Sequence, residues 1–213
     1  VSAFLLNRSS DLVVEADKMG FSSNFTIYDQ TDARSLVKSI IKEMGLDDKD
    51  YKPSAVSDQI SMAKNHLILP NAFVNCSLYD NKKPKVVDIY MRYSERCRQA
   101  NAMDFDDLLV NTWLLFNNHE EVRRKYVERF AFVLVDEYQD TNFAQQKIVL
   151  QLTLEPQRVC VVGDDAQSIY SFRGANIDNI LNFKDSYDNA KLLGDRLNGV
   201  RQFFAGLYLV GIE

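Results

Sequence analysis

Long hydrophobic runs are missing from this sequence of 213 residues. A helix that crosses a membrane needs about 18 or more consecutive apolar residues, and no such run is present. The first residues also lack a basic segment followed by an apolar one, which is the pattern of a secretory signal peptide. We therefore predict neither a membrane span nor secretion.

Cysteine is scarce and odd in number, with only Cys76, Cys97 and Cys160. Their wide spacing fits neither a disulfide framework nor a zinc site. The two histidines, His66 and His119, have no ligand partners at metal-binding spacing. This pattern indicates a reducing compartment, and we expect the protein to be cytoplasmic.

An excess of positive charge is missing too, since the formal net charge is -5 and the isoelectric point about 5.2. A protein that coats nucleic acid is usually basic, so this class is not favoured. An enzyme that binds nucleic acid along one local groove remains possible. Hydrophobic residues at 46% and charged residues at 26% indicate an ordinary globular protein.

A phosphate-binding loop of the form G-x-x-x-x-G-K-[ST] is also missing, because none of the eight glycines precedes Lys-Ser or Lys-Thr. Such a loop holds the phosphates of a nucleotide with backbone amides at a helix N-terminus and with its lysine. We therefore expect the chain alone not to bind ATP tightly.

Apolar residues at helical spacing predict short helices in the first hundred residues. A first helix begins at Ser10 or Asp11 and ends at Gly20, and a second begins at Thr31 or Asp32 and ends at Gly45. Further helices begin at Pro53 and beyond Pro84, and "NFTIYD" is expected to be extended.

From Met103 the pattern changes to two amphipathic helices, "MDFDDLLVNTWLLF" and "EEVRRKYVERF", followed by strands. The apolar runs Phe132–Val135 and Val159–Val162 lack polar alternation, which is typical of strands covered on both faces of a parallel sheet. "NFAQQKIVLQL" between them predicts the crossover helix. The inward stripe of the first helix is predicted to be Phe105, Leu108, Leu109, Thr112, Trp113 and Phe116.

Acidic residues follow both predicted strands, Asp136-Glu137 after the first and Asp164-Asp165 after the second. Ligands of open parallel sheets bind beyond the carboxyl ends of the strands. Asp136 is placed to hold a hard cation beside a phosphate, and Glu137 to orient or deprotonate an attacking water. An isolated Asp-Glu pair would more simply be a strand turning toward solvent, but the whole segment "VDEYQDTN" favours a site.

The segment "VVGDDAQSIYSFRGA" (Val161–Ala175) adds a second group of candidates. Gln167 could contact a terminal phosphate, and Arg173 could neutralise charge or pair with an acid. Tyr170 and Phe172 could stack on unpaired bases, although two such aromatics are more often part of a core.

These segments resemble the UvrD/Rep/PcrA-type superfamily 1 DNA helicases. "FVLVDEYQDTN" is similar to motif II and "VVGDDAQSIYSFRGA" to motif III, while "DFDDLL" resembles a segment just upstream of motif II. "EADKMGFSSNFTIYD" resembles the entry into the inserted helical subdomain called 1B. The resemblance covers residues 12–190 in order.

The resemblance implies an α/β fold, with part of the parallel sheet of a RecA-like P-loop NTPase and a mainly α-helical inserted subdomain. Residues 1–102 would be the 1B-like subdomain and residues 103–190 the part of the ATPase domain that holds motifs II and III. Residues 191–213 depart from the family pattern, because no motif IV follows motif III. The expected cofactors are ATP and Mg2+, and the expected partners are single-stranded and duplex DNA and DNA-repair proteins.

The resemblance also assigns roles to single residues. Asp136 would bind magnesium, Glu137 would be the catalytic base, and Gln167 would contact the γ-phosphate region. Tyr170 and Phe172 would face single-stranded DNA, and Arg173 would couple the nucleotide and DNA sites. Gln139 and Asp140 receive only supporting roles.

The leading interpretation is a fragment of an ATP-dependent DNA helicase, which by itself should neither hydrolyse ATP nor unwind DNA. Two alternatives stay open. One is a non-catalytic helicase-like module that binds DNA or a protein, and the other is part of a helicase–nuclease subunit. The basic loop with Lys82, Lys83 and Lys85 is either simply solvated or a contact to duplex DNA.

Overall fold

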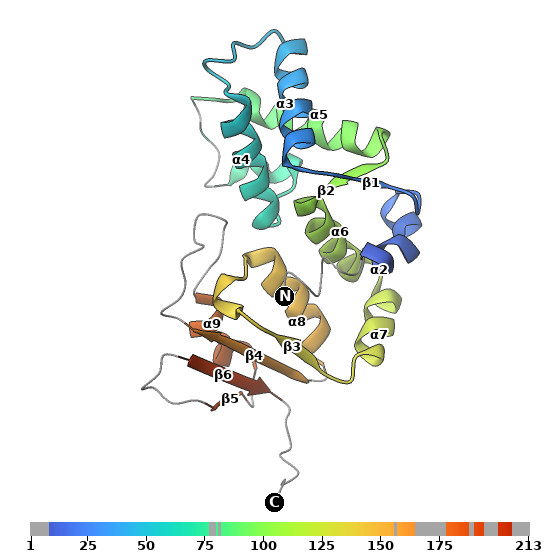
Figure 1. Ribbon diagram of the computed structural model, residues 1–213, viewed down its shortest axis with the longest axis vertical. Coiled ribbons are helices and arrows are strands. Elements are labelled where there is room, and N and C mark those ends of the chain that lie inside the picture. The colour runs from blue at the N-terminus through green and yellow to red at the C-terminus, as the bar shows by residue number, and fades with distance from the viewer. Residues whose placement is uncertain are drawn as a thin grey trace, which may run out of the picture. The chain divides into compact units, whose positions relative to one another are not determined.

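A computed structural model describes residues 9–76, 80, 82–155, 157–164, 178–187, 190–193 and 200–205. They form two compact units, one holding the described residues up to Thr112 and the other those from Trp113 on. Figure 1 shows the helices and strands of each unit. The division falls inside helix α6 (Phe105–Asn118), whereas the sequence suggested a boundary at residue 102, so the predicted domain limits stay a prediction.

The first unit is mainly helical, as predicted. Its strands β1 and β2 pair in parallel, with Thr26 opposite Ala102 and Tyr28 opposite Asp104. The predicted extended piece is thus confirmed, while β2 was not foreseen. In chain order its elements are α2 (Ser9–Val14), η1 (Ala16–Met19), β1 (Thr26–Tyr28), α3 (Gln30–Glu43), α4 (Pro53–Asn65), η2 (Pro70–Asn75), α5 (Lys85–Gln99), β2 (Ala102–Asp104) and the first part of α6.

Helix α3 begins earlier than predicted. Asp29, in extended backbone, accepts the N–H groups of Thr31 at 2.7 Å and Asp32 at 2.8 Å, and Asp32 accepts the N–H of Asp29 at 3.1 Å. This reciprocal capping box places the helix start at Gln30, and Thr31 and Asp32 lie within the first turn. The expected cap at either of those residues was therefore wrong.

The core of the first unit lies between α3, α4 and α5, whose apolar residues repeat every three or four positions. Ile41, Ala63 and Ile89 are completely buried. The hydroxyl of Tyr90 donates to the carbonyl of Ile68 at 3.0 Å, so this large side chain is buried without losing its hydrogen bond. The apolar spacing read from the sequence thus identifies the face of each helix that packs inward.

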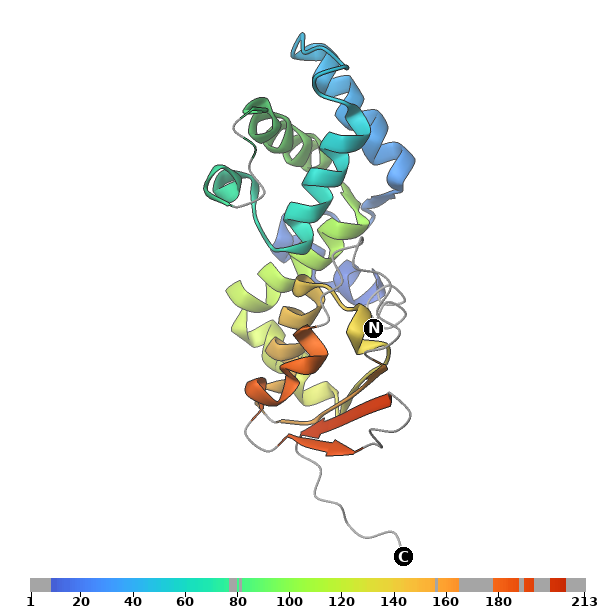
Figure 2. The same cartoon turned by 90° about the vertical axis from the view of Figure 1, so that its left-hand side faces the viewer.

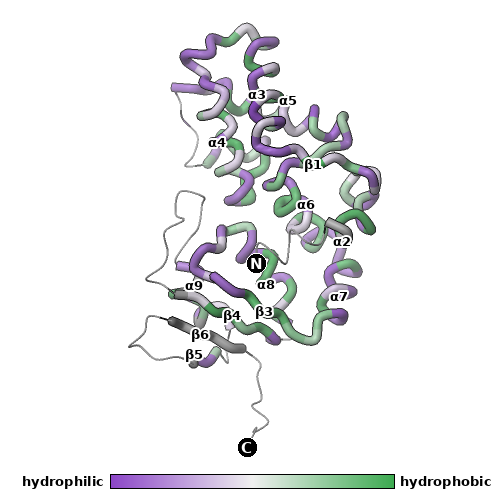
Figure 3. Tube along the Cα trace, in the orientation of Figure 1, coloured by the Kyte–Doolittle hydropathy of each residue, from purple (hydrophilic) through white to green (hydrophobic). Residues whose placement is uncertain are grey.

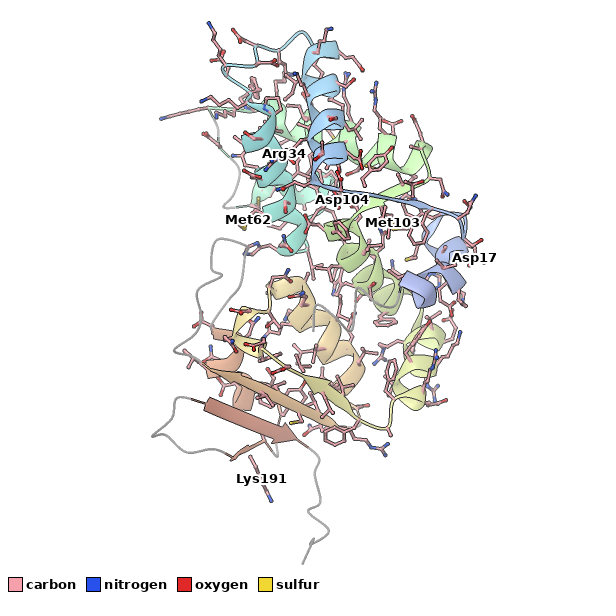
Figure 4. All side chains as sticks on the ribbon, in the orientation of Figure 1. Asp17, Arg34, Met62, Met103, Asp104 and Lys191 are labelled. Atoms are coloured by element: carbon pink, nitrogen blue, oxygen red, sulfur yellow. The ribbon has the colours of Figure 1, made fainter. Side chains whose placement is uncertain are left out.

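A charged cluster is also buried in this unit, formed by Lys64, Tyr93, Asp104 and Asp107. The ammonium of Lys64 lies 2.6 Å from Asp104 Oδ2 and 2.7 Å from Asp107 Oδ1, and its side chain is only 2% exposed. The hydroxyl of Tyr93 donates to Asp104 Oδ2 at 2.7 Å. Asp104, labelled in Figure 4, ends β2 directly before α6, so the cluster joins α4 and α5 to the start of α6.

The electrostatics of the cluster depend on Lys64. Burial disfavours its charge, but the neighbouring carboxylates of Asp107 and Asp104 outweigh that cost and raise the pKa of Lys64 above its ordinary value. Burial raises the pKa of Asp107 to about 6, although Lys64 opposes the shift. Burial would also raise the pKa of Asp104, but the attraction and hydrogen bonds of Lys64 and Tyr93 hold it below its usual range.

The second unit contains a four-stranded sheet in the order β3-β4-β6-β5. Strands β3 and β4 are parallel, whereas β6 is antiparallel to both β4 and β5. The predicted strand–helix–strand crossover is confirmed, and the fold is mixed α/β. In chain order the elements are α7 (Glu120–Arg129), β3 (Val133–Val135), η3 (Tyr138–Asp140), α8 (Phe143–Thr153), β4 (Val159–Asp164), α9 (Asp178–Leu181), η6 (Phe183–Ser186), β5 (Lys191–Leu193) and β6 (Val200–Ala205).

One face of the β3–β4 pair is covered by α8 and η6, whose Val149 and Phe183 pack on Val133, Val135 and their neighbours (Figures 1 and 2). The other face is less covered, because Leu134 is 70% exposed. Successive side chains of a strand point to opposite faces, so helices on the Val133 face leave Leu134 open. The prediction that β3 is covered on both faces was wrong.

The inward stripe predicted for α6 needs one correction. Leu108, Thr112 and Phe116 are buried, but Phe105 is 51% exposed. Phe105 is the first residue of α6 and directly follows β2. No earlier turn of the helix therefore lies beside its side chain. Val110, not assigned to the stripe, is buried instead.

None of the helices within the described residues has both the length and the apolarity that a membrane crossing requires.

Candidate active site

The candidate site lies at the end of β3. Strands β3 and β4 run side by side in the same direction, with Val135 opposite Val161. Their carboxyl ends therefore lie at the same edge of the sheet, as the sequence predicted. Asp136 and Glu137 follow β3 directly, and the chain changes there from hydrophobic to hydrophilic (Figure 3).

Asp136 is the first acid after the strand, and its side chain is exposed. Its Oδ1 atom accepts the backbone N–H of Glu137 at 2.9 Å. Within the described residues, its Oδ2 atom has no hydrogen-bond donor. The carboxylate is thus held by the turn on one side and is open on the other.

Glu137 has a left-handed backbone conformation, with φ 51 and ψ 42. For a residue with a side chain this conformation costs roughly 1–2 kcal/mol. The turn is fixed on both sides, since Asp136 accepts the N–H of Glu137 and the Glu137 carbonyl accepts the N–H of Asp140 at 2.9 Å. Backbone strain of this kind is often found at functional sites, where it fixes the orientation of a side chain. Here the strained residue is Glu137, whose carboxylate is exposed.

Gln139 is completely buried, with 0% of its surface exposed. Its side-chain Nε2 donates a hydrogen bond of 2.6 Å to Oε2 of Glu137. From the sequence, we predicted only a supporting role for Gln139 and assigned it no partner. Its contact depends on the left-handed turn at Glu137, and no pattern in the sequence signals that turn.

Asp140 adds a third carboxyl group to the turn. Its partial burial, and then the negative charge of Glu137, raise the pKa of Asp140 above its ordinary value. In the part of the chain that the structure describes, its Oδ1 atom is buried without a hydrogen-bond partner. The contribution of Glu137 to this shift indicates that the two carboxyl groups lie close enough for their charges to repel.

The turn is anchored by buried neighbours. The ring of Tyr138 is 1% exposed and lies edge-on to Phe183, with ring centroids 5.8 Å apart. The hydroxyl of Thr141 donates to the carbonyl of Tyr138 at 2.7 Å. Asn179 then donates from its amide to the carbonyl and the hydroxyl of Thr141, each at 3.0 Å. Helix α9 is thereby tied to the segment that follows Glu137.

Four predicted site residues, Gln167, Tyr170, Phe172 and Arg173, lie outside the described residues. Their roles toward phosphate and DNA stay predictions.

The basic loop was predicted as a possible contact to duplex DNA. The backbone N–H of Lys82 donates to Asp80 at 2.9 Å, which fixes the turn. Lys85 Nζ lies 2.9 Å from Asp88 Oδ2, and this hydrogen bond raises the pKa of Lys85. Lys82 and Lys85 are both exposed, and the role of this loop stays a prediction.

The residues present fit a magnesium ion that is bound together with a nucleotide. Magnesium usually keeps several waters and is held through one or two carboxylates and the phosphates of a substrate. Asp136 offers one such carboxylate, in which Oδ1 accepts the backbone N–H of Glu137 and Oδ2 accepts no hydrogen bond within the described residues. Among the described residues no group of three or more acidic, histidine or cysteine side chains gathers to hold a metal.

Most of the chain is similar to known proteins. The family model of the UvrD/REP helicase N-terminal domain matches residues 9–188. The ATP-dependent DNA helicase PcrA of Bacillus subtilis (strain 168) is 42% identical over 181 residues, which cover 84% of this chain and 24% of that protein. PcrA of Leuconostoc citreum is 39% identical over 177 residues, covering 83% of this chain and 23% of that protein.

A third relative is PcrA of Staphylococcus aureus (strain Mu50 / ATCC 700699), which is 40% identical over 179 residues. These residues cover 84% of this chain and 24% of that protein. The chain therefore spans about a quarter of the length of the curated relatives that it matches.

Proposed function

The chain belongs to the UvrD/REP helicase family, and from that membership we propose that it forms part of an ATP-dependent DNA helicase in which Asp136 and Glu137 serve ATP hydrolysis. The observation that carries the proposal is their position directly after a parallel strand, with both side chains exposed at the edge where ligands of such sheets bind. The proposal is further supported by the relatives, which are named ATP-dependent DNA helicases.

Each acid has a separate role in this proposal. Asp136 holds Mg2+ directly or through a bound water, which neutralises charge on the phosphates. Glu137 is the catalytic base that accepts a proton from the attacking water. Gln167 contacts the γ-phosphate, and Arg173 couples the nucleotide site to the DNA site.

The remaining predicted roles concern DNA. Tyr170 and Phe172 stack on the bases of single-stranded DNA, a contact that tolerates any sequence because every base has an aromatic face. The sheet with β3, α8 and β4 belongs to a RecA-like ATPase domain, and residues 1–102 form the 1B-like subdomain, whose basic loop is the candidate contact to duplex DNA. The whole protein then couples ATP hydrolysis to movement along single-stranded DNA during DNA repair or replication.

The test is ATP hydrolysis by the full-length protein in magnesium buffer, with and without a single-stranded oligonucleotide. We expect the DNA to raise the turnover rate. We also expect Tyr170→Ala and Phe172→Ala to raise the DNA concentration needed for half-maximal stimulation, because each stacked base contributes about 1–3 kcal/mol.

A matched control is Asp185→Asn, which removes an exposed carboxylate of the same unit outside the candidate site and should behave as wild type. Hydrolysis that is absent, or that is the same with and without DNA, would refute the proposed coupling. Hydrolysis that persists in Asp136→Asn would refute the role of Asp136.

A further inference from the structure

The contact between Gln139 and Glu137 assigns a role to a residue that the proposed function leaves without one. The Gln139 amide is fully buried, and a buried amide is costly unless it is hydrogen-bonded. It donates to the carboxylate of Glu137 at 2.6 Å, a charge-assisted hydrogen bond with short geometry. A rigid, buried donor therefore holds an exposed acid.

This pairing requires the local backbone. Side chains two positions apart in a regular helix do not face each other. Here the left-handed conformation of Glu137 is followed by the 3-10 turn Tyr138–Asp140, and together they bring the two side chains within hydrogen-bonding distance. The energetic cost of that conformation is consistent with a functional need to orient the Glu137 side chain.

The hydrogen bond leaves the two carboxylate oxygens of Glu137 unequal. Oε2 accepts from Gln139, while Oε1 accepts no hydrogen bond from any described residue. Oε1 is thus the atom available to take a proton. A carboxylate that rotated freely would present either oxygen in many orientations, and misplacement by about 1 Å can cost a catalyst 10²-fold.

We propose that Gln139 is a positioning residue, which fixes the carboxylate of Glu137 so that Oε1 faces the attacking water. This inference rests on the proposed ATP hydrolysis. In that reaction the water oxygen bonds to the γ-phosphorus, and the bond from this phosphorus to the bridging oxygen of ADP breaks. One water proton passes to Oε1 of Glu137 and then leaves to solvent, so that the products are ADP and inorganic phosphate.

The first experiment measures steady-state ATP hydrolysis by the full-length protein carrying Gln139→Leu. Leucine fills similar space and cannot donate a hydrogen bond. We expect kcat to fall about ten- to a hundredfold, because the carboxylate of Glu137 is no longer held in one orientation. The KM for ATP should change little, because the contacts to the nucleotide are kept. Gln139→Glu, of the same length, places a second carboxyl group against Glu137 and should be at least as slow.

The matched control is Gln146→Leu. Burial raises the pKa of Tyr138 in the same turn, and this shift is opposed by a contact from the side chain of Gln146 in α8. Its loss should lower the unfolding temperature without lowering kcat. If Gln146→Leu reduces kcat as much as Gln139→Leu, the effect is a general loosening of the turn and the positioning role is wrong.

A double-mutant cycle separates this inference from the proposed function. If Gln139 acts through Glu137, then Gln139→Leu should cause no further loss in a Glu137→Gln protein. Full turnover in Glu137→Gln alone would overturn the proposed function. Loss of turnover in Glu137→Gln, together with normal turnover in Gln139→Leu, would overturn only the positioning role.

A second readout needs no activity. In nuclear magnetic resonance spectra of the 213-residue chain, the side-chain amide protons of Gln139 should exchange slowly with solvent, because they are buried and bonded. Their resonances should move in Glu137→Ala and stay in place in Glu155→Ala, which removes an exposed carboxylate of the same unit. Gln139 amide resonances that do not move in Glu137→Ala would contradict the hydrogen bond between Gln139 and Glu137.

Discussion

Glu137→Gln is expected to lower the kcat of ATP hydrolysis in the full-length protein by about 10²–10⁴-fold. Glutamine has the same length as glutamate but accepts no proton at neutral pH, so the chemical step slows. The exposed side chain at the end of β3 supports no core, and folding should be unaffected. ATP binding, measured by equilibrium titration, should stay close to wild type because phosphate and metal contacts remain.

The matched control is Glu155→Gln, which changes an exposed glutamate beyond the end of α8 and should leave kcat unchanged. Thermal unfolding of both variants should coincide with that of the wild type. A Glu137→Gln protein that hydrolyses ATP at the wild-type rate would show that another group is the base, and the assignment of Glu137 would be abandoned.

Lys64→Met is expected to destabilise the first unit by about 3–5 kcal/mol. The Lys64 ammonium lies within 2.7 Å of two largely buried carboxylates, those of Asp104 and Asp107. Methionine fills much of the same space but leaves these acids without a positive partner, and an uncompensated buried charge is costly. Urea unfolding of the 213-residue chain, followed by circular dichroism, measures the change.

The control Lys38→Met removes an exposed lysine of α3 and should change stability by no more than about 0.5 kcal/mol. A further check is pH, because the pKa of Lys64 is raised above the ordinary value of 10.5. A raised lysine pKa stabilises the fold below 10.5, and this stabilisation is lost as the pH rises above that value. The Lys64 contribution should be missing from Lys64→Met, so its alkaline loss should be smaller than that of the wild type, while the raised pKa values of buried Tyr90 and Cys97 act in both proteins. Equal stability of Lys64→Met and Lys38→Met would contradict the role of the cluster.

Much of the fold follows from local patterns. The helical spacing of apolar residues predicted α3, and the crossover helix predicted between two apolar runs is α8. These elements could be predicted because their amphipathic faces repeat along the chain. The exposure of Leu134 could not, because it depends on which face of the sheet the helices cover.

The site was predictable only in part, for a similar reason. Asp136 and Glu137 were predicted as candidates because parallel strands bring their carboxyl ends to one edge, and the structure confirms that β3 and β4 are parallel. The contact of Gln139 with Glu137 arises from a backbone conformation with φ 51, which no periodic pattern encodes.

The buried charged cluster was missed in the same way. Lys64 and Asp104 are 40 positions apart in the sequence. Each lies in a segment whose local pattern predicts an ordinary amphipathic element and does not signal a buried charge. Only the packing of the first unit brings them together.

The most direct test of the site is a crystal structure of the full-length protein with magnesium and a non-hydrolysable ATP analogue. The Asp136 carboxylate should then contact the metal or a water bound to it. The carboxylate of Glu137, still held by Gln139, should lie about 2.6–3.2 Å from a water beside the γ-phosphate. A nucleotide bound away from the end of β3, with Asp136 and Glu137 facing bulk solvent, would contradict the assignment.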